Sequence, residues 1–595
     1  MKRALLERLS MIFRLGMFEE ILKKIYYVVI SFLYSVIFAG TVLGVIGLYR
    51  KVFVFVIVLL GTPAIYFLIL RPRKINIFHT QDVNQHPRIF SADNIVYYLS
   101  FILIISLILL PIVRWPESVA GDWFPWDAGK YHFPKAVEMV RSGSANDLTI
   151  AYGEYPFGYE SLLSFCILLT GDTVLFGWMH ALIDVFFILS FWLLACRLTK
   201  IKSSTLFFLI TLLILSNFLF QIFNLWQVFQ YEVITVGKND LFLAASVLAV
   251  LYLYPHPEPE QKTEERLLSI GLVGMIALSI KPNAAFILAP LWIILGLEMI
   301  INIAKFGYKP QKQSLLNYFF ASLIMVPGVS WLARNFILTR KIFSDEVLVA
   351  SKWSIFANLT NPYFYNYISK NVWLILALLF LMICLSIKNV KYRWITGSFF
   401  LLLIGFAFTP VSAFFLRTDV PATINWRFGE AMLAYVFIVI LFLLKKGTEK
   451  IGWLWKTHSL FSIIRVPIFL IVTITLIWSQ SNYLKIKASN QIILKDQFRD
   501  PVGVDGYYSA YDYVQKNVRN SVVWVENGLP FYAYGPGYTN TVSRRTSADY
   551  IIMIKTDWFG DGSHQIPRFF DPDNWQKIYS ILYEDPEGIV FALKK

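Results

Sequence analysis

Long apolar runs, broken by short polar segments, make up most of the chain before residue 480. A helix that crosses a membrane needs roughly 20 apolar residues, so this pattern predicts a polytopic α-helical membrane protein with about 13 spans. Some runs are shorter than that, and we expect those spans to extend into flanking aromatic residues. The predicted spans cover residues 25–48, 52–70, 95–113, 174–198, 204–223, 241–254, 267–280, 284–303, 315–338, 372–387, 395–415, 431–444 and 466–479.

Two segments do not fit this pattern of spans. Residues 1–24 are basic and amphipathic, and we expect them to lie along the cytoplasmic face of the membrane. The apolar run Leu162–Thr170 is too short to cross by itself, so it predicts a re-entrant or surface helix.

The longest polar interruption before residue 480 covers residues 114–160. Acidic residues cluster there, although the chain as a whole has a formal charge of +15. Tryptophan and tyrosine residues stand among these acids, and both residue types favour the boundary between membrane and water. We therefore expect a loop folded onto the membrane surface, with a short amphipathic helix over residues 133–142 resting on the interface.

The composition supports a membrane protein over a nucleic-acid-binding one. Apolar residues make up 57% of the chain and charged residues 16%, whereas soluble domains have roughly 25% charged residues. The mean hydropathy is +0.56. The lysines and arginines lie in short clusters between apolar runs, so membrane topology explains the positive charge better than nucleic acid does.

The positions of lysine and arginine predict the orientation. With the N-terminus inside, the basic clusters at 71–88, 197–202, 305–312, 388–393 and 445–465 all lie inside, as membrane proteins prefer. An odd number of spans then places the C-terminus outside. Ionisable groups near a bilayer are costly unless they are paired or functional. The same orientation gathers such groups at the outer face, namely loop 114–160, Lys238, Asp240, Lys281, Arg334 and Arg427.

The spanning pattern ends near residue 480. Residues 481–595 predict a small α/β domain on the outer face, with a helix followed by short strands between turn residues. The helix is expected at Ala510–Val518, and the strands at Ser521–Val525, Tyr550–Ile554, Lys577–Tyr583 and Gly588–Leu593.

Six short motifs follow one another along the predicted outer face. They are Trp126-Asp127-Ala128-Gly129-Lys130-Tyr131-His132-Phe133-Pro134, Glu154-Tyr155-Pro156 with Gly158 and Glu160, Gly237-Lys238-Asn239-Asp240, Lys281-Pro282, Trp331-Leu332-Ala333-Arg334-Asn335, and Asn425-Trp426-Arg427-Phe428. In their order and common face, the chain resembles the GT-C superfamily of membrane glycosyltransferases, which includes the protein O-mannosyltransferases and the lipid A aminoarabinose transferase. The resemblance implies an acidic catalytic residue in the first large external loop and a sugar donor linked to a lipid phosphate.

The resemblance covers residues 95–480, which would form the catalytic core. Residues 25–94 then supply two extra spans and an inner loop before that core. Many members of the superfamily carry an acidic pair where this chain has Asp127-Ala128.

Glycosyl transfer to a hydroxyl group needs a base, and a carboxylate can accept the proton as the hydroxyl attacks. Asp127 is the first candidate for this base, and its structural alternatives are a helix cap or an ion pair with Lys130. Asp122 is the second candidate. Glu154 would contact the acceptor or a metal, or form a surface ion pair.

The leaving phosphate needs positive charge, which arginine supplies through two parallel hydrogen bonds and lysine as a point charge. The candidates are Arg334, Lys281, Arg427, Lys238 and His132. Arg334 is preferred because it ends a span, although it could instead extend toward lipid headgroups. His132 alternatively bonds within the loop. Asp240 and Glu160 would contact the acceptor or serve the structure.

The sequence thus predicts a glycosyltransferase of the plasma (inner) membrane. It would move a sugar from a polyprenyl-phosphate donor to a hydroxyl on a lipid, glycan or protein, with Asp127 as general base. A transporter or flippase of lipid-linked sugars, and a glycan polymerase or ligase, are the alternatives. A divalent metal such as Mg²⁺ or Mn²⁺ on Asp127 and His132 stays open.

Overall fold

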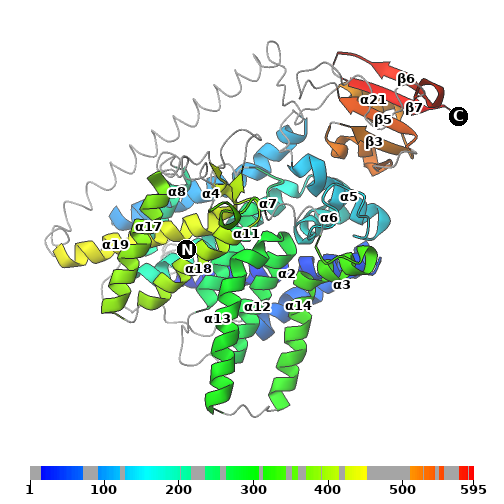
Figure 1. Cartoon of the computed structure of the whole chain (residues 1–595). Coiled ribbons are helices and arrows are strands. Elements are labelled where there is room, and N and C mark those ends of the chain that lie inside the picture. Colours follow the sequence, from blue (N-terminus) through cyan, green and yellow to red (C-terminus); the bar gives the residue numbers. More distant parts are fainter. Residues whose placement is uncertain are drawn as a thin grey trace, which may run out of the picture.

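The computed structural model comprises a large helical body and a small sheet domain at the C-terminal end of the chain (Figure 1). It describes residues 15–70, 92–120, 127–201, 203–215, 233, 235–254, 263–306, 312–343, 352–359, 370–389, 392–414, 423–451, 509–526, 528–542, 548–554, 575–586 and 588–594. The predicted span 466–479 and the candidate Asp122 lie outside these residues.

The helical body is built from the apolar runs of the sequence. Its helices are α2 (Leu15–Val45), α3 (Lys51–Ile65) continued by η1 (Tyr66–Leu70), α4 (Ala92–Ala120), α6 (Gly158–Thr170), α7 (Phe176–Thr199), α8 (Ser203–Leu215), α11 (Asp240–Leu253), α12 (Thr263–Ile280), α13 (Asn283–Phe306), α14 (Lys312–Thr339), α17 (Lys370–Lys388), α18 (Arg393–Phe408) and α19 (Glu430–Ile451). Residues 15–24 form the first turns of α2, continuous with the predicted first span.

Within the described residues, five helical stretches are long and apolar enough to cross a membrane. They are Glu19–Val45, Lys51–Leu70, Phe176–Thr199, Phe319–Thr339 and Trp426–Gly447. Seven further apolar helices are shorter. These helices indicate membrane association, and the total of about 13 spans stays a prediction.

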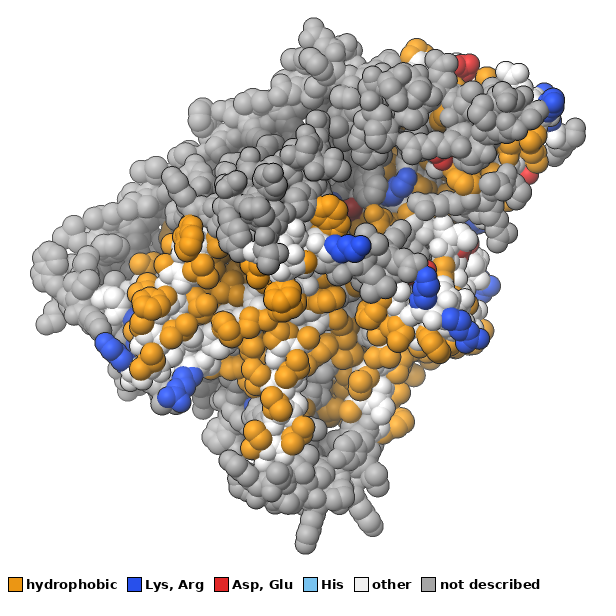
Figure 2. Space-filling model, viewed as in Figure 1, with side chains coloured by type: hydrophobic (Ala, Val, Ile, Leu, Met, Phe, Trp, Pro, Cys, Tyr) orange, Lys and Arg blue, Asp and Glu red, His pale blue; other side chains and the backbone are white. Residues whose placement is uncertain are grey.

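The helices differ in how much of their surface other helices cover. α7 and α11 are apolar on all sides and lie in the centre of the body, where buried residues line almost their whole length. α3 and α13 instead expose large side chains such as Leu59 and Ile300. Figure 2 shows hydrophobic side chains gathered over the part of the body that contains α13 and α14. An exposed apolar face of this size fits contact with lipid.

The segment Leu162–Thr170, expected as a re-entrant or surface helix, forms most of α6 and is largely enclosed. A methyl group at Gly158 would lie 2.4 Å from Ser279 Oγ, so the start of α6 closely approaches the end of α12. On the other side, α6 packs against α2 and α5 (Phe133–Ser142). Other helices therefore cover this short helix, and it needs no further length to bury its apolar surface.

The C-terminal domain has the α/β character that the sequence predicts. Its five-stranded sheet has the order β4-β3-β5-β7-β6, in which β3 pairs in parallel with β4 and β5, and β7 pairs antiparallel with β5 and β6. The elements are α21 (Ser509–Asn517), β3 (Val522–Glu526), η6 (Pro530–Tyr534), η7 (Pro536–Tyr538), β4 (Thr541–Val542), β5 (Tyr550–Ile554), α22 (Trp575–Ile578), β6 (Tyr579–Glu584) and β7 (Gly588–Leu593). The short edge strand β4 was not expected.

This domain lies beside α5 (Figure 1) and contacts it directly. The Tyr534 hydroxyl donates to the Pro134 carbonyl oxygen at 3.3 Å, and Arg141 donates to Thr541 Oγ1 at 2.7 Å. Phe133 and Val137 of α5 are fully buried. The helix expected to rest on the membrane interface is thus covered by α6 on one side and by the C-terminal domain on the other.

We expect Gly405→Ala to destabilise the helical body, because a methyl group there would lie 2.8 Å from both the Cα and the carbonyl oxygen of Ile287 in α13. The neighbouring helix backbone must then move away, which costs about 1–3 kcal/mol. Gly397→Ala is the matched control on α18, since its methyl group would meet no atom within 4 Å. Thermal unfolding in detergent should show a loss for Gly405→Ala only, and equal melting temperatures would contradict the packing.

Candidate active site

Five charged side chains form a continuous chain of ion pairs at one end of the helical body. Lys238 Nζ and Arg427 Nη2 both contact Asp127 Oδ2 at 2.7 Å. Arg427 Nε contacts Asp240 Oδ2 at 2.6 Å, and Asp240 Oδ1 also pairs with Lys281 Nζ. Charges therefore alternate from Lys238 through Asp127, Arg427 and Asp240 to Lys281. With three cations and two anions, the chain carries a net charge of +1.

Each of these side chains lies at or next to the start of a helical element. Asp127 directly precedes the single π-helical turn η2 (Ala128–His132), and Asp240 is the first residue of α11. Lys281 lies in the break between α12 and α13, where Pro282 prevents a continuous helix. Arg427 belongs to η5 (Trp426–Gly429), which precedes α19. The helical body thus brings four segments that are distant in sequence to one point.

A glycine allows two of these segments to meet. Gly237 has a φ of +98°, and a methyl group there would lie 2.2 Å from Ala128 Cβ. Its N–H donates to the Tyr159 hydroxyl at 3.1 Å. Only glycine combines this backbone angle with so close an approach, which places Lys238 beside Asp127.

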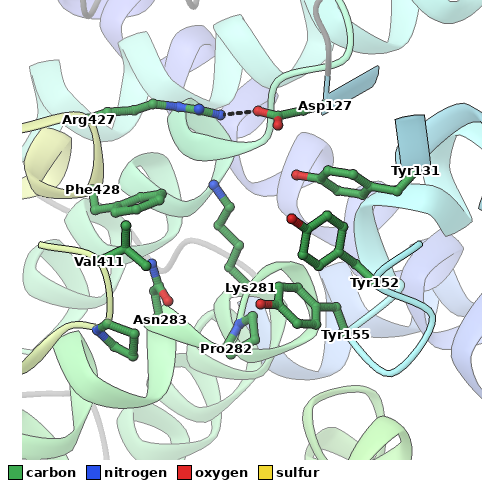
Figure 3. Close-up of a pocket in the computed structure, with 11 residues that line it drawn as sticks. Asp127, Tyr131, Tyr152, Tyr155, Lys281, Pro282, Asn283, Val411, Arg427 and Phe428 are labelled. Carbon is green, nitrogen blue, oxygen red and sulfur yellow. Dashed lines mark hydrogen bonds and ion pairs between the residues drawn. The ribbon is translucent and has the colours of Figure 1, made fainter. Parts of the chain in front are cut away.

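The ion-pair chain borders a cavity of about 190 Å³ (Figure 3). Asp127, Lys281 and Arg427 reach it, and Arg427 is the most exposed member of the chain, with 32% of its side chain accessible. The remaining lining is Tyr131, Tyr152, Tyr155, Pro282, Asn283, Pro410, Val411 and Phe428.

Three tyrosines form one wall of this cavity. Their rings contact one another, with centroids 4.8 Å apart for Tyr131 and Tyr152 and 5.0 Å for Tyr152 and Tyr155, and their hydroxyl groups point into the cavity (Figure 3). Tyr152 holds a φ of +55°, a conformation that a bulky residue rarely adopts. Opposite this wall, the centre of the Phe428 ring lies 4.9 Å from Lys281 Nζ, at cation–π distance. The cavity therefore combines aromatic faces, hydroxyl groups and positive charge.

The ion pairs set the protonation state of Asp127. Burial alone would raise the pKa of this carboxyl, but Arg427 and then Lys238 outweigh burial and hold its pKa well below the ordinary value. Asp127 is thus ionised throughout the physiological range. Lys238 and Arg427 both bind Oδ2, and the second oxygen of the carboxylate, Oδ1, can also accept a proton.

A second charged cluster lies behind η2 and α5. Glu160 Oε1 contacts His132 Nδ1 at 2.9 Å and Lys135 Nζ at 3.2 Å, and all three side chains are almost fully buried. Burial is the main influence on His132 and lowers its pKa, although Glu160 opposes this effect, so the ring is neutral near pH 7. Glu160 thus joins α6 to η2 through His132 and to α5 through Lys135, and neither His132 nor Glu160 lines the cavity.

Arg334 also serves the structure. Its guanidinium is buried and donates to the carbonyl oxygens of Ala145, Gly153 and Tyr155 at 2.7, 2.8 and 3.3 Å. It also lies 4.7 Å from the centre of the Phe157 ring. These contacts fix the loop that carries Tyr152 and Tyr155. These contacts give Arg334 a structural role, and it does not line the cavity that contains Asp127.

Of the other predicted candidates, some join the ion pairs around Asp127 and others lie away from the cavity. Lys281, Arg427, Lys238 and Asp240 join Asp127, as their common face predicted. Glu154 does not line the cavity, and its carbonyl oxygen accepts from Asn335 Nδ2 at 2.7 Å. Sequence reasoning missed the tyrosine wall, although the aromatic residues of the acidic loop were noted as an interfacial feature. The tyrosines lie close to Asp127 and Glu154 in the sequence, and this clustering could have predicted that they line the site.

Asp127 and His132, the two residues considered for a divalent metal, bind different partners. His132 Nδ1 bonds Glu160, while Asp127 Oδ2 bonds two cations. In the part of the chain that the structure describes, no three histidine, cysteine, aspartate or glutamate side chains lie close enough together to hold a metal ion. The residues around Asp127 thus suit an anion better than a divalent cation.

We expect Arg334→Ala to lower the free energy of unfolding by about 3 kcal/mol, because three carbonyl groups would lose their buried donor. Arg340→Ala, just beyond the end of the same helix, replaces an exposed arginine and serves as the control. Thermal unfolding measures the first effect, and titration with a polyprenyl phosphate should give unchanged affinity. A loss of phosphate affinity in Arg334→Ala without a loss of stability would instead show that Arg334 binds the phosphate.

Compared with known proteins, the chain matches no family model and no curated sequence.

Proposed function

We propose that the protein is a membrane glycosyltransferase that takes a sugar from a polyprenyl-phosphate donor and attaches it to a hydroxyl group. The observation that carries this proposal is the meeting of an ionised carboxylate and two cations, from three separate segments, at one tyrosine-lined cavity, with Lys238 paired to the carboxylate behind it. A buried carboxylate with cations beside it provides both the base and the phosphate contacts that this reaction requires.

In the proposed reaction, the acceptor hydroxyl oxygen attacks C1 of the sugar while the bond between C1 and the phosphate oxygen breaks. The hydroxyl proton passes to Oδ1 of Asp127, since Lys238 and Arg427 hold Oδ2. The phosphate leaves with the bonding electron pair, and Arg427 and Lys281 hold its negative charge. Attack opposite to the leaving phosphate inverts the configuration at C1.

The phosphate must compete with carboxylates for these cations. Arg427 and Lys281 already bind Asp127 or Asp240, so a bound phosphate draws charge away from those pairs. The net charge of +1 favours an incoming anion. As Arg427 turns toward the phosphate, Asp127 loses part of the field that holds its pKa low and becomes a stronger base.

The surroundings of the cavity suit the two ends of the donor. The tyrosine wall offers ring faces and hydroxyl groups to a sugar, and apolar helices with exposed side chains offer a surface for the lipid tail. In this proposal the cavity opens on the outer side of the plasma membrane, with the C-terminal domain on that side. Lipids, glycans and proteins with free hydroxyl groups are the candidate acceptors.

One observation bears on the alternative of a transporter. Asp184 is fully buried inside α7, with Oδ1 3.7 Å from His180 Nε2 one turn earlier. Ionisable pairs inside a membrane helix often belong to transport pathways. This pair does not line the cavity that contains Asp127, however. The charged groups at that cavity therefore favour the transferase.

We expect Asp127→Asn to reduce turnover by about 10²–10⁴-fold, because the amide cannot accept the proton. Donor affinity should persist or increase, since the variant leaves Arg427 and Lys238 with more uncompensated charge. Asp512→Asn, in an exposed ion pair of α21, is the matched control and should keep full activity. Transfer from a polyprenyl-phosphate sugar to an acceptor mixture is the assay. Full turnover by Asp127→Asn would remove Asp127 as the base.

The pH profile tests the ion pair itself. The base works when deprotonated, so its low pKa means that kcat/KM of the wild type should show no acidic decline from Asp127 above about pH 4. Arg427→Gln removes the main charge that lowers this pKa, so the decline should move to higher pH. Lys516→Gln, which breaks the exposed pair with Asp512, should not shift the profile. Identical profiles for Arg427→Gln and the wild type would contradict this coupling.

A further inference from the structure

The C-terminal domain contacts the turn that carries Asp127. Leu529 lies against Gly129 of η2, where an added methyl group would lie 3.0 Å from Leu529 Cδ1. The next residue, Lys130, donates from Nζ to the Gly528 carbonyl oxygen at 3.2 Å. The loop at residues 528 and 529 therefore covers η2 two residues after the proposed base.

The same turn is held from the opposite side by the helical body. Ala128 touches Gly237, at the loop that begins α11. The residues Ala128 and Gly129 are thus enclosed between the element that supplies Lys238 and the C-terminal domain. Since Asp127 is the residue just before this enclosed pair, the direction of its carboxylate depends on both contacts.

Leu529 is itself firmly anchored in the C-terminal domain. It is fully buried, and its backbone N–H donates to the Tyr511 hydroxyl of α21 at 2.7 Å. Phe531 packs against Phe133 with ring centroids 5.2 Å apart. This contact joins the domain to α5 directly after η2. A movement of the C-terminal domain would therefore displace η2 through these packed side chains.

We propose that the C-terminal domain positions the Asp127 carboxylate, with Leu529 as the positioning residue that presses on Gly129. The effect on turnover rests on the proposed glycosyl transfer. The contact between the C-terminal domain and η2 does not depend on that function. A displacement of about 1 Å at a reacting group can cost up to 10²-fold in rate. Loosening or tightening this contact should therefore change kcat more than the KM of the donor.

The experiment is a double-mutant cycle in the full chain. Leu529→Ala leaves a gap beside Gly129, and Gly129→Ala adds a methyl group that crowds Leu529 and must displace it by a few tenths of an ångström. Each single variant should lower kcat by about 10–100-fold with the donor KM little changed. The double variant lets the new methyl group occupy the space that the leucine leaves. Its kcat should exceed that of either single variant.

Ile551→Ala is the control for general weakening of the domain. Ile551 is fully buried in β5 and belongs to a separate apolar cluster on the sheet. Hydrogen–deuterium exchange over residues 127–141 provides a measurement that does not depend on activity. Exchange there should rise in Leu529→Ala, stay at the wild-type level in Ile551→Ala, and fall again in the double variant.

These measurements separate the two proposals. If the wild type transfers no sugar, the proposed function fails, and exchange over residues 127–141 alone then decides whether the domain holds η2. Unchanged exchange in Leu529→Ala overturns the positioning role. If the enzyme is active, raised exchange in Leu529→Ala without a loss of kcat also overturns it. A loss of kcat in Ile551→Ala equal to that in Leu529→Ala overturns it as well. Recovery of both kcat and protection in the double variant supports it.

Discussion

The chain of alternating charges from Lys238 through Asp127, Arg427 and Asp240 to Lys281 is the interaction on which the rest of the site depends. Buried charges are costly unless each has a close partner with good geometry. Here each internal member of the chain has two partners of opposite sign. Removing an internal member would take one partner of opposite sign from each of its neighbours, so the four segments that supply these side chains must keep their relative positions.

This constraint also explains why the site lies where helices begin and end. A side chain in the middle of an apolar helix faces lipid or other helices, whereas a break such as Lys281-Pro282 exposes polar backbone and frees a long side chain. Arg427 occupies a comparable break before α19 and bridges both aspartates. The same arrangement that satisfies the buried charges leaves one excess cation for an incoming anion.

A second set of buried polar contacts keeps the loop around the cavity in place. Arg334 binds three carbonyl groups of the loop, and Glu160 binds both His132 and Lys135. These groups satisfy donors and acceptors that would otherwise be buried without partners. Their effect on the cavity is indirect, since they hold Tyr152 and its neighbours in the wall.

The sequence alone predicted most helices of the helical body, since a long apolar run can satisfy its backbone hydrogen bonds only within a helix in an apolar surrounding. It also predicted the C-terminal strands at 550–554 and 588–593. It also predicted that Asp127, Lys281 and Arg427 share one face of the membrane. Only the tertiary structure decided the pairing, because Asp127 and Arg427 are 300 positions apart and local patterns contain no information on such contacts. For the same reason, the inward turn of Arg334 and the contact between the C-terminal domain and η2 appeared only once the helices were packed.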